Sequence, residues 1–476
     1  MNGANGNGRE RGVMVTNPGG GQMRTFETAI GLQQAGLLQL FVAGFYFKPE
    51  SVWGRAVRWF VEGSGTRLES LLRGRYHPEI PPERVLSFPQ ADLAYQCLGR
   101  IARMPKAASR VVLWRNQWFD RRVVRTLEDR RPAAVMCFDG TGLHAFERAR
   151  ELGILSVLDQ CTSHIKTGVR LMREEAERHP EWADSLPWKN SALQVERCCK
   201  ELEVADAVMI SSEYAKQTLV DNGVAADKIF VNPMAANISR FEPRAQNPGE
   251  PFRVLFVGQI SQRKGIKYLL EAFQKLHLPN AELVLVGGLV GSGAGLRPYL
   301  LNIIRHVPSI AFLDLHPYYQ FASIFVMPSL HESGVLAIHE ALASGLPVIA
   351  TPNCGSIVRD GIEGFIVPIR DVDALQEKIL LLYENHALRG EMSCRARKRA
   401  EEFTWAAYRQ RVAQIFNQLL AGKERGLRMQ TTMKSPGEMQ REFFARTVAT
   451  YDAAPVHAAV PMPVAAFQNR WARWQE

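Results

Sequence analysis

The sequence predicts an α/β protein with two domains, each built around a parallel β-sheet. Short apolar runs rich in β-branched residues alternate with stretches of helical period from residue 13 to about residue 420, which is the pattern of strands joined by helices. The chain has 476 residues, more than the roughly 250–300 residues that one hydrophobic core organises. A polar, Pro-containing stretch at residues 242–251 interrupts the periodicity and predicts a domain boundary. We therefore place the first domain at residues 1–245 and the second at residues 246–403.

Each expected strand is followed by Gly, Pro or a polar turn residue. The loops should therefore gather at one edge of each sheet, where open α/β sheets bind ligands. The strands expected in the first domain are residues 13–16, 39–45, 133–138, 154–158, 207–211 and 229–231. Those expected in the second are residues 253–257, 282–286, 310–313, 323–327, 347–351 and 365–367.

The C-terminal part of the chain predicts one further helix and a tail. After Thr404 an amphipathic stretch reaches about Leu420, so we expect a helix at residues 404–421 that crosses back to the first domain. Residues 422–476 lack sustained periodicity and predict a weakly ordered tail.

Composition favours a globular, cytoplasmic protein. Hydrophobic residues make up 46% and charged residues 22% of the chain, as in ordinary globular domains. Residues 1–12 lack the apolar centre of a signal peptide, and the apolar run at residues 36–47 is too short to span a bilayer. The seven Cys residues show no spacing typical of a metal site or a disulfide framework. We expect reduced thiols and no bound metal.

Much of the net charge of +10 lies in a basic segment, residues 48–131, in which Trp residues are interleaved with Arg and Lys. Such a surface suits anionic lipid or a lipid-phosphate acceptor. A solvated basic face is the alternative explanation. Peripheral membrane contact through this segment is therefore a hypothesis, and we expect no nucleic-acid partner.

The stretch from Pro328 to Thr351 carries the most chemical information. A strand ends at Pro328, Glu332 lies in the following loop, a helix is expected to begin near Ser333, and Glu340 lies two turns later. The exposed amides at a helix N-terminus suit a phosphate, and the two acids are placed to accept hydrogen bonds from hydroxyls on either side of it. The position of Glu332 can be explained without a ligand, because the helix dipole stabilises an acidic side chain near a helix N-terminus. Glu340, however, lies in an apolar helix, where a buried acid needs a partner. The amides expected at the phosphate belong to Ser333, Gly334, Val335 and Leu336.

This stretch resembles the retaining GT-B glycosyltransferases of family 4, also called glycosyl transferases group 1. Their signature is a Glu, seven residues, a second Glu, then Ala-Leu-Ala and Gly-Leu-Pro-Val-Ile-Ala, as found from Glu332 to Ala350. The similarity continues at residues 211–216, 257–273 and 361–368, covers most of residues 200–420 and is weaker over residues 1–200. The resemblance implies two Rossmann-like domains facing across a cleft, the first binding the acceptor and the second the nucleotide sugar.

The resemblance also implies roles for individual residues. Glu332 would contact the donor sugar and Glu340 the ribose, while Lys264 would bind the diphosphate. The family has a second cation there, an Arg; because that Arg is absent, we expect Arg263, beside Lys264, to supply this cation. Such fixed cations stabilise the charge that accumulates as the diphosphate departs. No metal or other cofactor is implied beyond the nucleotide diphosphate sugar itself. Gln259 stands where relatives carry an Arg.

Three further loops supply candidates. A Gly-rich loop after the first strand lets the backbone approach a ligand closely, and the family uses it near the donor phosphate. His164 follows the strand at residues 154–158, where many relatives place a His facing the donor sugar, and a structural role is the alternative. Gly258 ends the first strand of the second domain. The loop candidates for donor binding are Gly19, Gly20, Gly21, Gly258 and Gln259.

We predict a retaining glycosyltransferase that moves a sugar from a UDP- or GDP-sugar to a glycan, lipid-linked or other hydroxyl acceptor, in cell-surface polysaccharide or glycoconjugate synthesis. The alternative is a catalytically degenerate GT-B subunit that binds a glycan or protein partner. It is motivated by Gln259 and by residues 314–322, a shorter connection than relatives usually have. A dinucleotide oxidoreductase is disfavoured because residues 19–21 lack the GxGxxG order and no acid is placed for the ribose.

Overall fold

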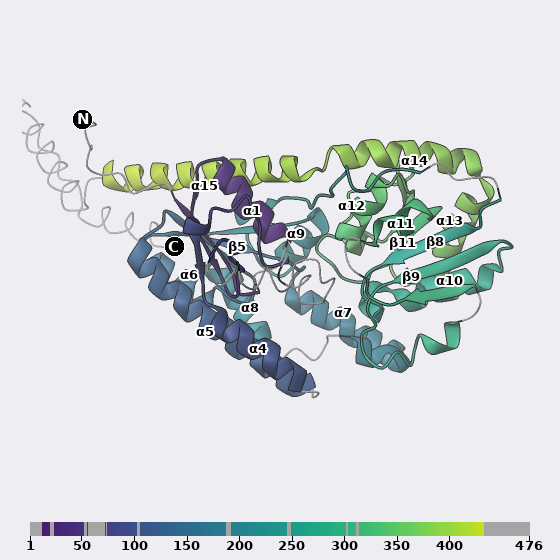
Figure 1. Cartoon of the computed structure of the whole chain (residues 1–476), viewed down its shortest axis with the longest axis horizontal. Coiled ribbons are helices and arrows are strands. Elements are labelled where there is room, and N and C mark those ends of the chain that lie inside the picture. Colours follow the sequence, from purple (N-terminus) through teal and green to yellow (C-terminus); the bar gives the residue numbers. More distant parts are fainter. Residues whose placement is uncertain are drawn as a thin grey trace, which may run out of the picture. The chain divides into compact units, whose positions relative to one another are not determined.

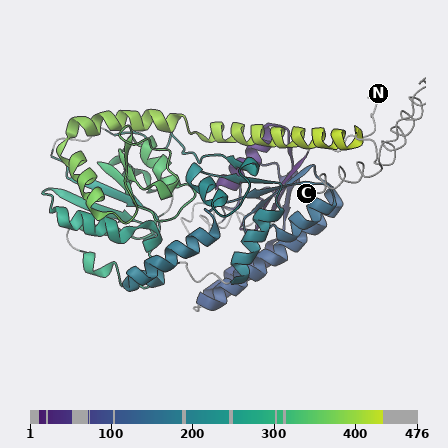
Figure 2. The same cartoon turned by 180° about the vertical axis from the view of Figure 1, so that it is seen from behind.

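The computed structural model describes residues 12–19, 23–51, 55, 72, 74–101, 105–186, 192–244, 249–300, 303–310 and 314–432. Residues 1–420 form one compact unit and residues 421–476 a second. The first unit contains two parallel sheets, of seven and six strands, flanked by helices (Figures 1 and 2). This confirms the predicted α/β class with two Rossmann-like sheets.

The first sheet has the order β3-β2-β1-β4-β5-β6-β7, with every neighbouring pair parallel. The order of strands reverses between β1 and β4, because β2 and β3 lie on one side of β1 and β4 to β7 on the other, as in dinucleotide-binding folds. The strands are β1 Val13–Asn17, β2 Leu38–Ala43, β3 Val85–Ser87, β4 Ala134–Phe138, β5 Leu155–Asp159, β6 Ala207–Ile210 and β7 Ile229–Val231. The helices are α1 Met23–Gln34, α4 Pro89–Ile101, α5 Pro105–Arg130, α6 Leu143–Glu151, α7 Ile165–Arg178, α8 Ala192–Val204 and α9 Glu213–Val220.

Helices cover both faces of the first sheet because successive strand residues point to opposite sides. Val13 and Val15 of β1 belong to one hydrophobic cluster, which includes α1 and α15 Trp405–Thr432. Met14 belongs to another, which includes α5, α6, α8 and α9. Figure 1 shows α1 beside α15 on one face and α5 with α6 on the other. The strands are therefore buried on both sides, which explains their nearly continuous apolar sequences.

The second sheet has the order β10-β9-β8-β11-β12-β13 and is also parallel throughout. Its strand order reverses between β8 and β11. Helices α10 and α13 pack against each other, as do α12 and α14. The strands are β8 Phe252–Val257, β9 Ala281–Val286, β10 Ile304–Val307, β11 Ile324–Met327, β12 Val348–Ala350 and β13 Gly364–Ile366. The helices are α10 Ile266–Leu276, α11 His316–Gln320, α12 Leu336–Ala343, α13 Val372–Glu384 and α14 His386–Glu401.

Two edge strands differ from the sequence prediction. A strand was expected at residues 310–313. This prediction is wrong for Ile310, which lies outside any strand, and residues 311–313 lie outside the described residues. The strand at this edge is β10, which carries the polar residues Arg305 and His306. Strand β3 was not predicted at all. Edge strands are short and less fully buried, so they lack the apolar run that marks a central strand.

Helix α15 is longer than predicted. It begins at Trp405 and extends to Thr432, beyond the expected end at residue 421. Tyr408, Val412 and Phe416 are fully buried in the cluster that contains β1. Up to residue 420 the helix therefore packs on the first sheet although it follows the second in sequence. Of the predicted tail, residues 433–476 lie outside the described residues.

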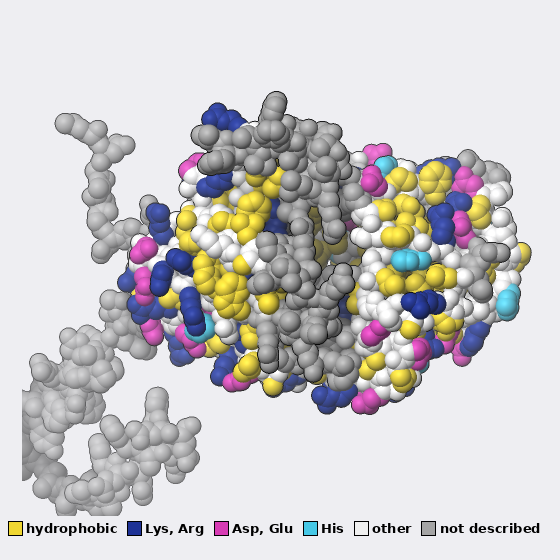
Figure 3. Space-filling model, turned by 60° about the horizontal axis from the view of Figure 1, so that its bottom comes forward, with side chains coloured by type: hydrophobic (Ala, Val, Ile, Leu, Met, Phe, Trp, Pro, Cys, Tyr) yellow, Lys and Arg dark blue, Asp and Glu magenta, His cyan; other side chains and the backbone are white. Residues whose placement is uncertain are grey.

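The structure describes only part of the basic segment. Residues 52–54, 56–71, 73 and 102–104, and the side chains of residues 96–110, lie outside the described part. Among its described cations, Arg75 pairs with Asp92 at 2.8 Å and Arg122 lies 4.9 Å above the Trp118 ring. On the face in Figure 3, described Lys and Arg side chains alternate with Asp and Glu. None of the described helices combines the length and apolar character needed to cross a bilayer.

Candidate functional site

The candidate site lies at the point where the strand order of the second sheet reverses, between β8 and β11. The loop after β8 carries Gly258, Arg263 and Lys264, and the loop after β11 carries Glu332. Since β8 and β11 are parallel neighbours, their carboxyl ends lie side by side. Open α/β sheets bind ligands in the crevice formed at such a reversal.

Glu332 brings the two loops together. Its carboxylate Oε1 contacts Lys264 Nζ at 2.7 Å and also pairs with the Arg263 guanidinium. Burial raises the pKa of the Glu332 carboxyl, but the cations of Lys264 and Arg263 outweigh it, so that pKa lies below its usual range. Three residues named from the sequence therefore form one charged cluster, in which Lys264 is only 8% exposed.

Close backbone packing holds these loops in place. Gly265 has φ +68°, and a Cβ there would lie 2.0 Å from the carbonyl oxygen of Pro328. Arg263 accepts at its carbonyl from the amide of Leu330, at 2.9 Å. A Cβ on Gly334 would lie 2.8 Å from Cβ of Ser211 in the first domain. Glycine is needed at 265 because the backbone of another loop occupies the space of a side chain, and at 334 the Ser211 side chain occupies that space.

Helix α12 begins at Leu336, later than the predicted start near Ser333. The four amides at residues 333–336 donate to no acceptor within the described part of the chain. The buried hydroxyl of Ser333 likewise has no hydrogen-bond partner among the described residues. These donors precede a helix N-terminus, an arrangement suited to an anion. They belong to Ser333, Gly334, Val335 and Leu336.

The first domain meets the Glu332 loop through the segment after β5. The Ser163 hydroxyl donates to the carbonyl oxygen of Glu332. His331 packs against Gly168, where a Cβ would lie 2.7 Å from the imidazole Nε2. Burial lowers the pKa of His331 to about 4, so its ring is neutral at neutral pH.

His164 has a structural role in this arrangement. Its Nδ1 accepts from the amide of Lys166 at 3.3 Å and thereby caps helix α7. The ring is buried, and burial, followed by the charge of Lys166, lowers the pKa of His164 to about 4. Contact with a sugar remains a prediction for this residue. The Gly-rich loop is described only at Gly19, whose amide donates to Asn17 Oδ1 at 2.8 Å; residues 20 and 21 lie outside the described residues.

Glu340 occupies a different environment from Glu332. It is 3% exposed and accepts from the Tyr319 hydroxyl of α11 at 2.7 Å. Burial raises the pKa of Glu340 to about 7, against the opposing effects of Tyr319 and Arg240. Helix α11 lies within residues 314–322, the connection that is short by sequence, so this short connection supplies the partner of Glu340. Ribose binding by Glu340 stays a prediction, as does a donor role for the exposed Gln259.

Substituting Glu340→Gln should change how stability depends on pH. The folded-state pKa is raised from 4.5 to about 7, so the wild type loses stability as the pH rises through this interval, whereas Gln does not titrate. The free energy of unfolding of the variant minus that of the wild type should therefore increase by on the order of 3 kcal/mol between pH 4 and pH 8. Urea unfolding at several pH values measures it. The exposed Glu377→Gln provides the control, and a difference independent of pH would contradict the placement of Glu340.

A cavity of about 650 Å³ lies where the Glu332 loop meets the carboxyl ends of β4 and β5. The second domain contributes Arg263, His331 and Glu332 to its lining. Burial, together with Glu201 and Asp159, raises the pKa of Asp139 in this lining to about 7. Polar first-domain residues in the lining are Arg115, Asn116, Asp139, Gln160, Thr162, Ser163, Gln194 and Arg197. Cations, carboxyl groups and amides thus surround one space, as polyhydroxylated ligands require.

Several lining residues were not found from the sequence. Thr162 and Ser163 stand beside His164 directly after a strand, a position that could have signalled them. Arg115 and Arg197 lie on α5 and α8, far apart in sequence and without a motif. Within the described residues, no three His, Cys, Asp or Glu side chains are grouped to hold a metal ion.

Comparison with known proteins identifies the part of the chain that contains the charged cluster. Residues 251–385 match the family described as Glycosyl transferases group 1. This glycosyl transferases group 1 segment includes β8 to β13, Lys264, Glu332 and Glu340. It agrees with the resemblance inferred from the motif at residues 332–350.

Curated proteins similar to this chain include D-inositol 3-phosphate glycosyltransferases from two bacteria. The one from Streptosporangium roseum is 27% identical over 241 residues, which are 45% of this chain and 55% of that protein. The one from Corynebacterium diphtheriae is 29% identical over 255 residues, 47% of this chain and 59% of that protein. The chain thus spans little more than half the length of these relatives.

Solved structures extend the similarity to the whole fold. Sucrose-phosphate synthase from Thermosynechococcus elongatus aligns with a TM-score of 0.55 and 19% identity, covering 87% of this chain and all of that one. Alr3699/HepE of Anabaena, solved in complex with UDP and glucose, aligns with a TM-score of 0.55 and 14% identity, covering 85% of this chain and 99% of that one. These likenesses, together with two Rossmann-type sheets, confirm the predicted GT-B fold.

Proposed function

We propose that this chain is a retaining glycosyltransferase that moves a sugar from a nucleoside diphosphate sugar to a hydroxyl acceptor without a metal ion. The observation that carries the proposal is the cluster of Lys264, Arg263 and Glu332 beside the amides of residues 333–336. Two cations and a helix N-terminus complement a diphosphate in charge and in hydrogen bonding. The group 1 match and the curated glycosyltransferase relatives support the same activity.

In this proposal, charge stabilisation drives the reaction. As the bond between the sugar and the diphosphate breaks, negative charge grows on the departing oxygens, where Lys264 and Arg263 stabilise it. Once the diphosphate engages these cations, the Glu332 carboxylate can turn to accept a hydroxyl of the donor sugar. The role of protein groups is thus electrostatic, and no side chain is required as a nucleophile.

The 650 Å³ cavity is the proposed acceptor site. It adjoins Glu332, and most of its lining belongs to the first domain. Its mixture of Arg, Asp, Asn and Thr side chains suits hydroxyl groups of a glycan or of a lipid-linked sugar. We extend the proposal to acceptors used in cell-surface polysaccharide or glycoconjugate synthesis, with the basic segment at residues 48–131 as the contact to a membrane surface.

Calorimetric titration with UDP, GDP, ADP and NAD tests the proposal. We expect one nucleoside diphosphate to bind and NAD not to bind, and we expect the same affinity after treatment with EDTA, because Lys264 and Arg263 supply the positive charge that a metal would otherwise provide. Loss of affinity in EDTA would contradict metal independence alone. Failure of all three diphosphates to bind would contradict the proposed function.

A further inference from the structure

A segment of the first half of the chain packs into the second domain. We call residues 165–186 the bridging segment; it contains α7 and the short helix η2 Pro180–Ser185. It lies between β5 and β6 of the first sheet in sequence, yet Leu171, Met172 and Trp182 belong to the hydrophobic cluster around β8 to β12. The Asp184 carboxylate also accepts a hydrogen bond from the backbone amide of Ser292 in the second domain, at 2.6 Å. The bridging segment is therefore anchored in the second domain by both apolar and polar contacts.

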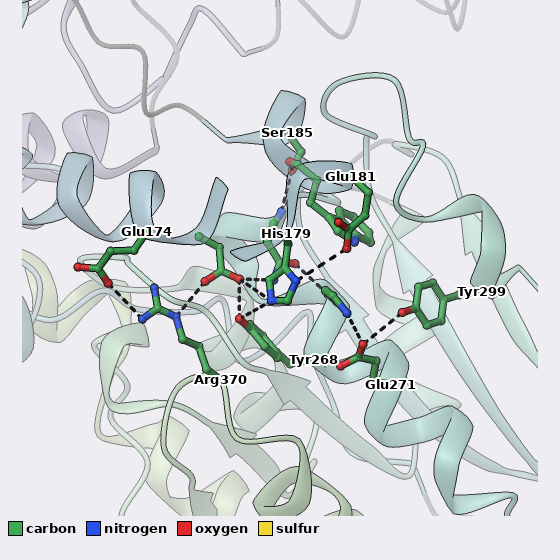
Figure 4. Close-up of polar contacts among 12 residues, drawn as sticks. Glu174, His179, Glu181, Ser185, Tyr268, Glu271, Tyr299 and Arg370 are labelled. Atoms are coloured by element: carbon green, nitrogen blue, oxygen red, sulfur yellow. Dashed lines mark hydrogen bonds and ion pairs between the residues drawn. The ribbon is translucent and has the colours of Figure 1, made fainter. Parts of the chain in front are cut away.

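Glu175 is the centre of a buried polar cluster, of which Figure 4 labels the members Tyr268 and Arg370. Its side chain is fully buried, and its two carboxylate oxygens accept from three second-domain donors. Oε1 accepts from the Tyr268 hydroxyl at 2.6 Å and from Gln262 Nε2 at 2.7 Å, while Oε2 accepts from Arg370 Nε at 2.9 Å. Figure 4 shows Arg370 reaching from its loop toward Glu174 and the bridging segment. These three hydrogen bonds offset the free-energy cost of removing the Glu175 carboxylate from water.

Gln262 has every polar group engaged. Its backbone amide donates to the Ser185 hydroxyl at 3.0 Å, its side-chain NH2 donates to Glu175, and its Oε1 accepts from the amide of Lys267 at 3.0 Å. It is fully buried and immediately precedes Arg263 in the short helix Gln262–Lys264. The bridging segment is thus hydrogen-bonded to Gln262, the residue directly before the two cations of the candidate site.

We propose that Glu175 is a positioning residue, which holds Gln262 and thereby fixes the backbone that presents Arg263 and Lys264 to the diphosphate. The inference rests on the proposed function of those two cations. Charge-assisted hydrogen bonds are strong and directional, and binding groups must be held within about 0.5 Å of their productive geometry. Without the Glu175 carboxylate, the Gln262 NH2 group is buried with no acceptor, at a cost that favours rearrangement of residues 261–265.

A double-mutant cycle on nucleoside diphosphate affinity tests this inference. Glu175→Met and Gln262→Met each keep most of the side-chain volume and remove the hydrogen bond between them. With the nucleotide that binds the wild type, UDP in the first instance, each variant should bind about tenfold more weakly. The double variant should bind no more weakly than the worse single variant, because both changes break the same link. Losses that multiply in the double variant would overturn the inference.

Glu174→Gln is the matched control. Glu174 neighbours Glu175 and contacts the same Arg370, at 3.2 Å, but it is part-exposed and its described contacts do not include Gln262. Its substitution should leave UDP affinity within about twofold of the wild type, as for other exposed ion pairs. If Glu175→Met does not fold, Gln262→Met, which leaves Glu175 with Tyr268 and Arg370, tests the inference by itself.

Hydrogen exchange gives a readout that needs no nucleotide. The amides of Lys264 and Gly265 donate to Ser261 and Gln262 carbonyls at 3.0 and 2.9 Å. Their exchange should be faster in Gln262→Met than in the wild type or in Glu174→Gln, and unchanged exchange would overturn the positioning role. Faster exchange in a protein that binds no diphosphate would instead refute the proposed function while retaining the positioning of this loop.

Discussion

Replacing Lys264 with Ala is expected to weaken nucleoside diphosphate binding by at least about 30-fold, corresponding to roughly 2 kcal/mol. The Lys264 ammonium is 8% exposed and lies 2.7 Å from the Glu332 carboxylate. Removing it eliminates a charge-assisted contact to the diphosphate. It also leaves Glu332 with Arg263 alone, so more negative charge faces the incoming anion. Calorimetry with the nucleotide that binds the wild type measures the effect.

Lys267→Ala is the control for this experiment. Lys267 lies three residues further along and pairs through its side chain with Glu271 on the same helix. Its backbone amide, which donates to Gln262, is unaffected by the substitution. Affinity should therefore stay near that of the wild type. Equal affinity in Lys264→Ala and the wild type would remove the main support for the donor site.

Glu332→Gln should separate binding from transfer. In the structure the Glu332 carboxylate forms ion pairs with Arg263 and Lys264, the two cations that are proposed to bind the diphosphate. A neutral amide competes with the diphosphate less, so UDP should bind as tightly as to the wild type or more tightly. Transfer should fall by about 100- to 1000-fold, because a charged group that contacts the sugar in the transition state is lost.

Release of the nucleoside diphosphate from the matching nucleotide sugar measures transfer, and calorimetry measures binding. Glu271→Gln, which changes a carboxylate on α10 that pairs with Lys267, is the matched control and should leave both unchanged. Weaker UDP binding together with full transfer would show that Glu332 supports the cations and takes no part in the reaction. The pattern expected for Glu332→Gln, retained binding with reduced transfer, thus differs from that expected for Lys264→Ala, in which both quantities fall.

The central strands could be predicted because burial on both faces imposes a continuous apolar sequence. Val254 to Val257 and Ile324 to Met327 are almost entirely buried and lie within a residue or two of their expected bounds. The edge strands β3 and β10 could not, since solvent on one side permits residues such as Arg305. The far end of α15 was also missed, because its last turns lack the apolar face that marks its buried part.

The candidate site shows the same division. Glu332, Arg263 and Lys264 were named from the sequence, and the structure brings them together because their loops follow adjacent parallel strands. The partner of Glu340 was not predicted. Tyr319 lies in a connection that sequence comparison suggested was short, and only its packing against Phe325 and Phe241 places its hydroxyl at the acid.

The sequence by itself determined the fold class, the two-sheet organisation and the charged residues of one motif, because periodicity and local spacing are properties of neighbouring residues. The tertiary structure decided which distant residues share a site. Arg115 and Arg197 reach the cavity from separate helices, and Glu175 reaches Gln262 across 87 residues of chain. Such contacts arise from the packing of whole elements, and no local pattern records them, so they are found only once the elements are assembled.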